Sequence, residues 1–313
     1  MTSGADERLL GGRYRLGRRL AAGGRAEVFL ARQLALRREV VVKTARGPGA
    51  ADELAREAQA LARVAHESVV AVHEVGADRG RAFLVLERVR GRTVRALARE
   101  RAWTPAAVAE LLGAITRALA QVHREGWAHG DVRAENVVVV TRSGAADAGA
   151  AALAVKLIDF GEAQPLSATE PLPRVWGKAP GGLAPERRRG GVASVAADLY
   201  AVGVIGWELL HGRTFPGGAA PPPGWAPDGA VGAAVQAVVM GLCADDPARR
   251  PARAELAAQA LDGSSSPRAR LAPEPARQGA TRVTRPRPLR AIPRDEHVGP
   301  PPRAQGARRP VST

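Results

Sequence analysis

The chain has 313 residues, of which 45% are apolar, and 46 Lys and Arg stand against 31 Asp and Glu. This apolar content suffices for a buried core, which excludes a wholly disordered protein, and the lone Cys243 excludes an intrachain disulfide. The first residues carry acids where a signal peptide would be basic, and the longest apolar-rich run, 199–210, is shorter than the roughly 20 residues of a membrane span. We therefore expect a cytoplasmic protein without a membrane span.

Residues 1–12 form an N-terminal extension, and β-type patterns dominate from there to about residue 92. One amphipathic helix, 51–64, interrupts short runs rich in β-branched residues, and these runs are 14–21, 26–34, 38–45, 69–75 and 81–89. Helical periodicity dominates afterwards. A small sheet with one helix, followed by a larger helical part, predicts an α+β protein with two lobes, 13–87 and 88–262, and a ligand cleft between them.

The first candidate site lies where the apolar run VVVK ends in Lys43. Arginine is the usual cation of this chain, which has only three lysines, so a lysine at this place is unusual. Glu57 follows fourteen residues later, beside the apolar stripe of the expected helix. A strand lysine paired with a helix glutamate can hold its ammonium group against two phosphates, because the carboxylate fixes the flexible stem. A solvated lysine at a strand end is the alternative.

A second candidate site is the stretch AHGDVRAENVVVV, residues 128–140. Asp131 and Asn136 flank a short loop ahead of the valine run, so a carboxylate can accept a hydroxyl proton while an amide oxygen binds a metal. A later run, VKLIDFG, reaches Asp159. Each segment alone also fits a strand followed by a turn, because Asp and Gly are ordinary turn residues.

The order of these motifs resembles that of the eukaryotic-type serine/threonine protein kinases of bacteria and eukaryotes, from Tyr14 to Leu261. VVVK resembles V-A-I-K, HGDVRAEN resembles H-R-D-L-x-x-x-N, and DFG and APE match directly. Downstream, Asp198 lies in a segment similar to the helix that supports the catalytic loop, and Arg250 stands where the family pairs an arginine with the APE glutamate, here Glu186. The resemblance implies the bilobal protein kinase fold.

The resemblance also implies transfer of the γ-phosphoryl group of ATP, with Mg²⁺, to Ser or Thr hydroxyls of proteins. Lys43 would hold the α- and β-phosphates and Glu57 would orient it, while Asp131 would handle the substrate hydroxyl and Arg133 would stand near the transferred phosphate. The implied Mg²⁺ ligands are Asn136 and Asp159. The implied ATP-pocket residues are Ala21, Gly23, Val28, Val41, Lys43, Leu86, Glu87, Val89 and Val138. Among these, residues 87–89 would form the interlobe hinge whose backbone meets adenine.

Several positions depart from the family pattern. In the glycine-rich loop AAGGRAEV, residues 21–28, alanine replaces two of three glycines, so the backbone approaches a phosphate less freely. Val41 replaces the alanine that packs on adenine, which predicts a tighter slot. Gly130 replaces the arginine that usually clamps a phosphorylated activation loop. We therefore hypothesise that activity does not depend on phosphorylation of Ser167 or Thr169.

These departures keep other function classes open. A pseudokinase that binds nucleotide as a scaffold is favoured by Ala21, Ala26, Val41, Arg133 in place of lysine and Ala179 in place of threonine. Gly182, in place of an aromatic residue, and Ala179 also alter two supports of Asp131. The letters HGD also resemble the loop of aminoglycoside-type small-molecule phosphotransferases. Against that class stand APE, Asp198 and Arg250, which belong to the peptide-docking lobe of protein kinases.

The last 51 residues, from Gly263, hold ten prolines, eleven arginines and three acids. This composition predicts a disordered basic tail that either binds an acidic partner or is a solvated linker. Nucleic acid is a disfavoured partner because the tail has no aromatic residues for stacking. Two internal segments, 141–154 and 217–229, are expected to be surface loops without chemistry.

Overall fold

The computed structural model of the chain describes residues 9–140, 153–172, 182–218, 222, 226–227 and 229–265. These residues all belong to one unit of the chain, Met1–Glu274. The predictions for residues 1–8, for most of the two internal loops, for Ala179 and for the tail beyond Ser265 lie outside the described residues.

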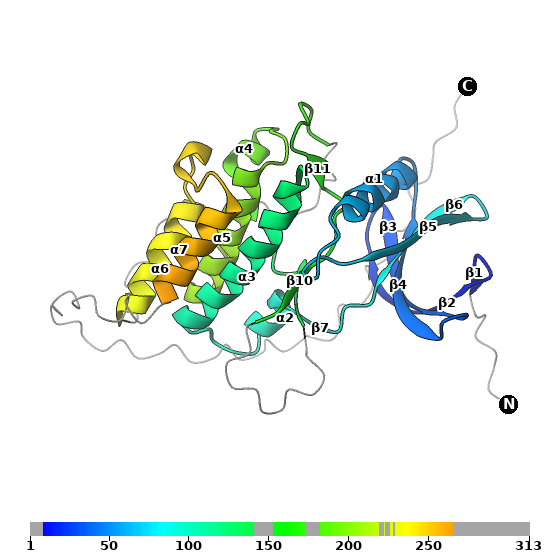
Figure 1. The fold of residues 1–313 in the computed structure, drawn as a ribbon, viewed down its shortest axis with the longest axis horizontal. Helices are drawn as coiled ribbons and strands as arrows, with labels where there is room; N and C mark the ends of the chain where they lie inside the picture. The colour runs from blue at the N-terminus through cyan, green and yellow to red at the C-terminus, as the bar shows by residue number, and fades with distance from the viewer. Residues whose placement is uncertain are drawn as a thin grey trace, which may run out of the picture. The chain divides into compact units, whose positions relative to one another are not determined.

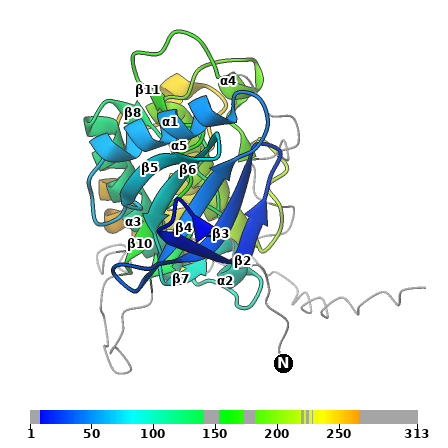
Figure 2. The same ribbon diagram turned by 90° about the vertical axis from the view of Figure 1, so that its right-hand side faces the viewer.

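The N-terminal lobe is a six-stranded antiparallel sheet with strand order β1-β2-β3-β4-β6-β5 (Figure 1, Figure 2). Its strands are β1 (Leu9–Leu10), β2 (Tyr14–Ala22), β3 (Ala26–Gln33), β4 (Arg38–Ala45), β5 (Val72–Asp78) and β6 (Arg81–Glu87). Four strands match the expected runs closely, but β5 begins three residues late. Val69 instead forms a single parallel bridge with Leu157 in the other lobe.

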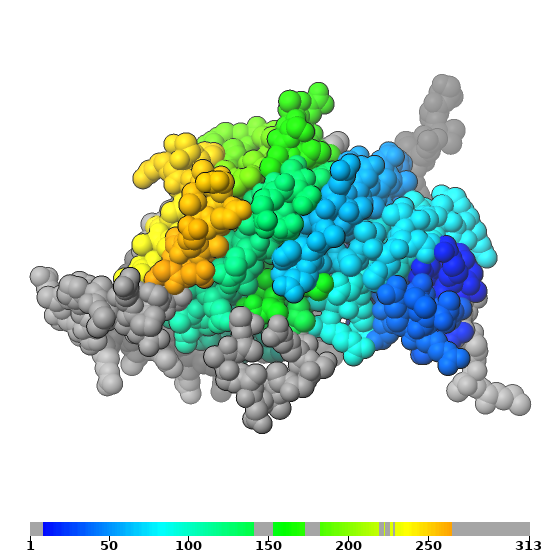
Figure 3. Space-filling model, viewed as in Figure 1, coloured from blue at the N-terminus to red at the C-terminus, as the bar shows by residue number. Residues whose placement is uncertain are grey.

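The residues of strand β4 alternate between the two faces of the sheet: one face is packed in a core, and the other carries candidate site residues. Val40 and Val42 are fully buried on one face, in a core with Phe83. Because side chains alternate along a strand, Val41 and Lys43 point to the opposite face. Helix α1 (Ala50–Arg63) packs on that opposite face, and Figure 3 shows its exposed side.

The C-terminal lobe is helical, and its long helices run side by side (Figure 1). Its elements are α2 (Val94–Ala98), α3 (Pro105–Arg124), α4 (Pro185–Arg188), α5 (Val195–His211), α6 (Gly229–Leu242), a 3₁₀ turn (Pro247–Arg249) and α7 (Ala254–Ser265). Thr104 and Ser194 cap the first turns of α3 and α5, where their hydroxyls accept backbone N–H bonds. Within the described ranges, no helix has both the length and the apolarity needed to cross a membrane.

Five short strands join these helices, and only the two that follow Asn136 and precede Asp159 lie in runs that the sequence offered as candidate strands. They are β7 (Gly91–Thr93), β8 (Trp127–Ala128), β9 (Val137–Val140), β10 (Val155–Leu157) and β11 (Gln164–Pro165). They form one sheet with order β10-β9-β7 and another of β11 and β8. The loop 129–136 lies between β8 and β9, and the DFG residues lie between β10 and β11. Both candidate loops are therefore anchored at each end by a strand pair.

Candidate active site

Lys43, Glu57 and Asp159 meet in one charged cluster. The Nζ atom of Lys43 lies 2.8 and 2.7 Å from the two carboxylate oxygens of Glu57 and 2.9 Å from Oδ1 of Asp159. Lys43 and Glu57 are buried, whereas the side chain of Asp159 is 47% exposed. The cluster is therefore closed on the side of α1 and open on the side of Asp159.

The charges in this cluster depend on one another. Burial alone would lower the pKa of the Lys43 ammonium group, but the carboxylates of Glu57 and Asp159 outweigh burial and raise that pKa. Lys43 is therefore charged at neutral pH. Burial raises the pKa of Glu57, and the adjacent ammonium group opposes this rise. Each charge of the buried pair is tolerated because the other lies within hydrogen-bond distance.

The turn between β2 and β3 lies next to this cluster. In the sheet, Ala21 pairs with Val28, and Val28 pairs with Lys43. The N–H of Gly23 donates to the carbonyl of Ala26 at 2.9 Å and closes the turn. The structure thus brings the predicted phosphate-loop residues to the strand that carries Lys43.

The predicted adenine slot and hinge lie further along the same strands. Val41 pairs with Leu86, and Leu86 is followed by Glu87 at the end of β6. The side chain of Glu87 accepts a bond from Lys156 Nζ at 2.6 Å, so it ties the hinge to β10. Val89 packs on the main core. Val138 of β9 is buried and pairs with Lys156 of β10.

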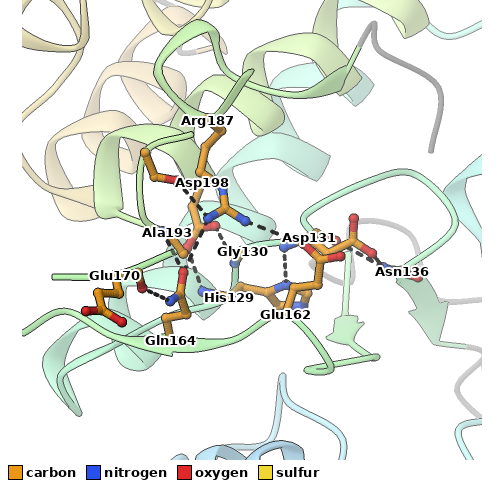
Figure 4. A network of polar contacts seen from close by, with 11 residues as sticks. His129, Gly130, Asp131, Asn136, Glu162, Gln164, Glu170, Arg187, Ala193 and Asp198 are labelled. Atoms are coloured by element: carbon orange, nitrogen blue, oxygen red, sulfur yellow. Dashed lines mark hydrogen bonds and ion pairs between the residues drawn. The ribbon is translucent and has the colours of Figure 1, made fainter. Parts of the chain in front are cut away.

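Asp131 and Asn136 face each other in the loop between β8 and β9 (Figure 4). The Nδ2 atom of Asn136 donates to the Asp131 carboxylate at 2.8 Å and to the Asp131 carbonyl at 3.0 Å. Because the amide nitrogen is turned toward Asp131, the amide oxygen is turned away from it. An amide oxygen and the exposed Asp159 carboxylate are hard oxygen ligands, and Mg²⁺ usually takes one or two such groups together with phosphates. These residues therefore fit a magnesium–nucleotide complex.

Buried Asp198 supports the catalytic loop from behind. Its carboxylate accepts backbone N–H bonds from His129 at 2.8 Å and from Gly130 at 2.9 Å, and it also contacts His123 Nε2 at 2.9 Å. Burial would raise the pKa of Asp198, but the bonds from His123 and the Gly130 amide outweigh it, and the pKa is lowered. A carboxylate thus stays ionised inside the lobe and sets the path of the chain just before Asp131.

The predicted catalytic Arg133 lies in a chain of ion pairs. Its Nε lies 2.9 Å from Glu135, and Glu135 also binds Nε of Arg95 at 2.9 Å. Burial would raise the pKa of Glu135, but hydrogen bonds from Arg133 and Arg95 lower it to about 2. The hydrogen bond to Glu135 raises the pKa of the Arg133 guanidinium group, and the charges of Asp131 and Asp159 add to this rise. Arg133 is therefore held beside the catalytic loop by Glu135, with its charge close to both aspartates.

Two further contacts support the site, and the first of them was predicted. Arg250 makes a bidentate pair with Glu186, at 2.6 and 2.9 Å, and is itself buried. Phe160 of DFG lies on the ring of buried His129, with 4.4 Å between ring centroids. The first contact joins α4 to the segment between the 3₁₀ turn and α7. The second contact joins the DFG segment to the catalytic loop.

Residues 14–220 match the protein kinase domain family. The chain belongs to this protein kinase family. The predicted family and the predicted α+β fold of two lobes are therefore confirmed.

Several named bacterial kinases are similar to this family member. The probable serine/threonine-protein kinase CE0033 of Corynebacterium efficiens is 36% identical over 64% of this chain and 31% of that protein. Serine/threonine-protein kinase PknL of Mycobacterium tuberculosis is 36% identical over 67% of this chain and 52% of that protein. Serine/threonine-protein kinase pkn3 of Myxococcus xanthus is 30% identical over 85% of this chain and 52% of that protein. The chain thus spans between 31% and 52% of the length of these relatives.

A solved structure supports the same fold. The kinase domain of Mycobacterium tuberculosis PknI superposes with a TM-score of 0.60 at 21% identity, covering 84% of this chain and 100% of the PknI domain. At this identity the likeness concerns the fold alone.

Some residues of the kinase site were not anticipated from the sequence. His123, Lys156, Gln164 and Arg187 all contact the segments that carry the predicted site residues. Lys156 had a signal, because it is one of only three lysines. Arg187 had none, because it is one of three consecutive arginines and nothing in their order shows which of them is buried.

Proposed function

We propose that this chain transfers the γ-phosphoryl group of ATP, in the presence of Mg²⁺, to Ser or Thr hydroxyls of proteins. The observation that carries the proposal is the cluster in which Lys43 binds Glu57 and Asp159 together. Phosphoryl transfer by protein kinases needs both the lysine–glutamate pair and the DFG aspartate in place. The contact of the Lys43–Glu57 pair with the DFG aspartate, Asp159, supports the proposal.

The roles of the side chains follow from this arrangement. Lys43, oriented by Glu57, would bind phosphate oxygens, and Asn136 and Asp159 would hold Mg²⁺, which neutralises phosphate charge when bound. Asp131 would accept the proton of the substrate hydroxyl as its oxygen bonds to the γ-phosphorus and ADP leaves. The bond from Asn136 would fix the Asp131 carboxylate for this task. Arg133 would add positive charge near the transferred group.

The adenine slot is proposed to lie between the sheet and the hinge. Its lining would comprise Ala21, Gly23, Val28, Val41, Leu86, Val89 and Val138, together with the backbone of Glu87. We propose kinase-domain boundaries at 13 and 262, although α7 itself runs on to Ser265. The relatives' names motivate the choice of Ser and Thr as acceptors.

The setting and the partners are further parts of this proposal. ATP as a substrate and the single, buried and unpaired Cys243 suit a reducing cytoplasm. The basic composition from Gly263 onward suits an acidic partner, because opposite charges attract at long range.

The test is transfer of label from γ-labelled ATP with Mg²⁺. The purified chain would be incubated alone and with a generic basic protein, beside Asp131→Asn and Lys43→Met variants and a sample treated with a metal chelator. We expect transfer by the wild type and loss of transfer in all three controls.

Other outcomes would identify the alternatives. Stabilisation of the wild type by Mg²⁺ and ATP without any transfer would replace the proposal with a nucleotide-binding pseudokinase. Transfer to aminoglycosides but not to proteins would replace it with a small-molecule phosphotransferase.

A further inference from the structure

Arg187, in the short helix α4, is buried although its neighbours Arg188 and Arg189 are exposed. Only 4% of Arg187 is accessible to solvent. Arginine is almost never buried unless it is paired, because removing its charge from water is costly. The burial of one arginine out of three points to a specific set of partners.

The partners of Arg187 come from two segments outside α4. Its NH1 donates to Oε1 of Gln164 at 3.3 Å and to the carbonyl of Gly191 at 3.2 Å. Its NH2 lies 3.4 Å from Oε2 of Glu162, the residue that follows DFG. One guanidinium group therefore ties α4 to the beginning of the activation segment and to the chain ahead of α5 (Figure 4).

Gln164 extends this connection in two directions. Its Oε1 also accepts the N–H of Ala193 at 2.9 Å, and its Nε2 donates to the carbonyl of Glu170 at 2.9 Å. The strand that contains Gln164 pairs with β8, directly before the catalytic loop. The side chain of Gln164 thus spans the activation segment from residue 164 to residue 170.

The same residues enclose Gly130, which precedes Asp131. Gly130 has φ +77°, and a Cβ atom there would lie only 2.3 Å from the carbonyl oxygen of Glu162 and 3.3 Å from the Cβ of Ala193. Glu162 and Ala193 are the residues that Arg187 holds, directly or through Gln164. The two residues that pack against Gly130 are therefore ones that Arg187 contacts directly or through Gln164.

We propose that Arg187 is a positioning residue that holds the activation segment, 162–170, against the catalytic loop without a phosphate group. This inference rests on the proposed kinase function. Ser167 and Thr169 are exposed, and neither side chain forms a hydrogen bond within the part of the chain that the structure describes. Gly130, at the position of the phosphate-clamping arginine, has no side chain that could bind a phosphate. The tie comes instead from Arg187 in α4, through Glu162 and Gln164.

The first test compares Arg187→Met, Arg187→Lys and the exposed-neighbour control Arg188→Met in the label-transfer assay. Displacing catalytic groups by about 1 Å costs on the order of 100-fold in rate, so we expect Arg187→Met to lower kcat by at least about tenfold. The KM for ATP should stay unchanged, because the Lys43 cluster is separate. Arg187→Lys, which keeps the charge, should recover part of kcat. Arg188→Met and a Ser167→Ala/Thr169→Ala double variant should match the wild type.

The second test does not depend on turnover. Hydrogen exchange of the Ala193 amide, which is bonded to Gln164, should be faster in Arg187→Met than in the wild type, whereas exchange in β4 should be the same. If Arg187→Met does not fold, Glu162→Gln, which alters a partly exposed side chain, should show the same two effects in smaller measure.

The outcomes separate this inference from the proposed function. A wild type that transfers no label contradicts the proposed function, and the exchange experiment then decides the role of Arg187 alone. Unchanged kcat and unchanged Ala193 exchange in Arg187→Met would overturn the inference. A loss of transfer in the Ser167→Ala/Thr169→Ala variant would overturn it as well, because phosphate would then be needed.

Discussion

The nucleotide side and the protein-substrate side of this site are built differently. On the nucleotide side, one buried ion pair, Lys43–Glu57, and one partly exposed carboxylate, Asp159, carry the charge. On the substrate side, Asp198 binds two backbone N–H groups of the catalytic loop, and Arg187 binds the side chains of Glu162 and Gln164 in the activation segment.

The two sides therefore depend on different interactions. The nucleotide side consists of a few charged groups that would bind phosphates and Mg²⁺. Binding of ATP there should therefore depend on the Lys43–Glu57 ion pair and on the size of the adenine slot. The substrate side is held by several hydrogen bonds that join the catalytic loop and the activation segment to Asp198 and Arg187, and such preorganised contacts cost no rearrangement at the moment of reaction. Variants on the two sides should therefore fail in different measurements.

The largest expected effect is on stability, from Lys43→Met. This change leaves the buried carboxylate of Glu57, 2% exposed, without its ammonium partner. Breaking a buried pair in this way costs about 3–5 kcal/mol, whereas an apolar replacement of both partners is often neutral. Urea unfolding should show this loss in Lys43→Met and its recovery in Lys43→Met/Glu57→Leu. Equal losses in the single and the double variant would contradict a cost that arises from the unpaired carboxylate.

The deficit of Lys43→Met should also depend on pH. Burial already raises the pKa of Glu57, and removing Lys43 removes a group that lowers it. A carboxyl whose folded pKa is raised contributes stability at pH values below its unfolded pKa, and this contribution is lost as pH rises through the folded pKa. The stability gap between Lys43→Met and Lys43→Met/Glu57→Leu should therefore be larger at pH 8 than at pH 5. A gap that does not change with pH would show that the carboxyl is not the source.

The next effect, on rate, concerns the substrate side. Gly130→Arg would restore the family's usual residue, but φ +77° and the 2.3 Å approach of the Glu162 carbonyl exclude a side chain. The backbone before Asp131 must shift, and we expect transfer to fall by roughly 100-fold. Gly130→Ala should be nearly as impaired, because the clash begins at Cβ. Stabilisation by Mg²⁺ and ATP should persist in both variants, and a gain of activity in Gly130→Arg would contradict this account.

A smaller effect is expected in the adenine slot. Val41→Ala removes two methyl groups from the face that carries Lys43, and we expect a KM for ATP lower by roughly tenfold at most. Val42→Ala is the matched control, because Val42 is buried on the opposite face of the same strand. That control should lose stability and keep its KM for ATP. A similar change of KM in both variants would show that general loosening of the sheet, and not the slot, is responsible.

The smallest expected effect is none. Ser167→Ala/Thr169→Ala removes both candidate phosphorylation sites of the described activation segment, where both side chains are exposed. Label transfer should equal that of the wild type, and mass spectrometry would establish whether the wild type carries phosphate at either position. A collapse of activity would mean that the substrate side is assembled by phosphate after all.

The sequence by itself determined the family, the order of the two lobes and several long-range contacts. The sequence predicted two ion pairs that the structure contains, Lys43 with Glu57 and Glu186 with Arg250. This was possible because their motifs stand in a specific order along the chain. The run of β-branched residues in β4 and the apolar stripe of α1 are local properties, so the sequence predicted those elements.

Tertiary structure alone decided the remaining features. Strands of two to four residues, such as β8 and β11, are too short to show a period, and they form because distant segments are brought together. The sequence also cannot show which arginine of 187–189 is buried, since all three are chemically identical. Arg187 differs from its neighbours because its guanidinium group contacts Glu162, Gln164 and Gly191. These contacts form when α4 packs against the activation segment. Burial and pairing of a charge depend on the surrounding fold, and that is why this residue emerged only from the structure.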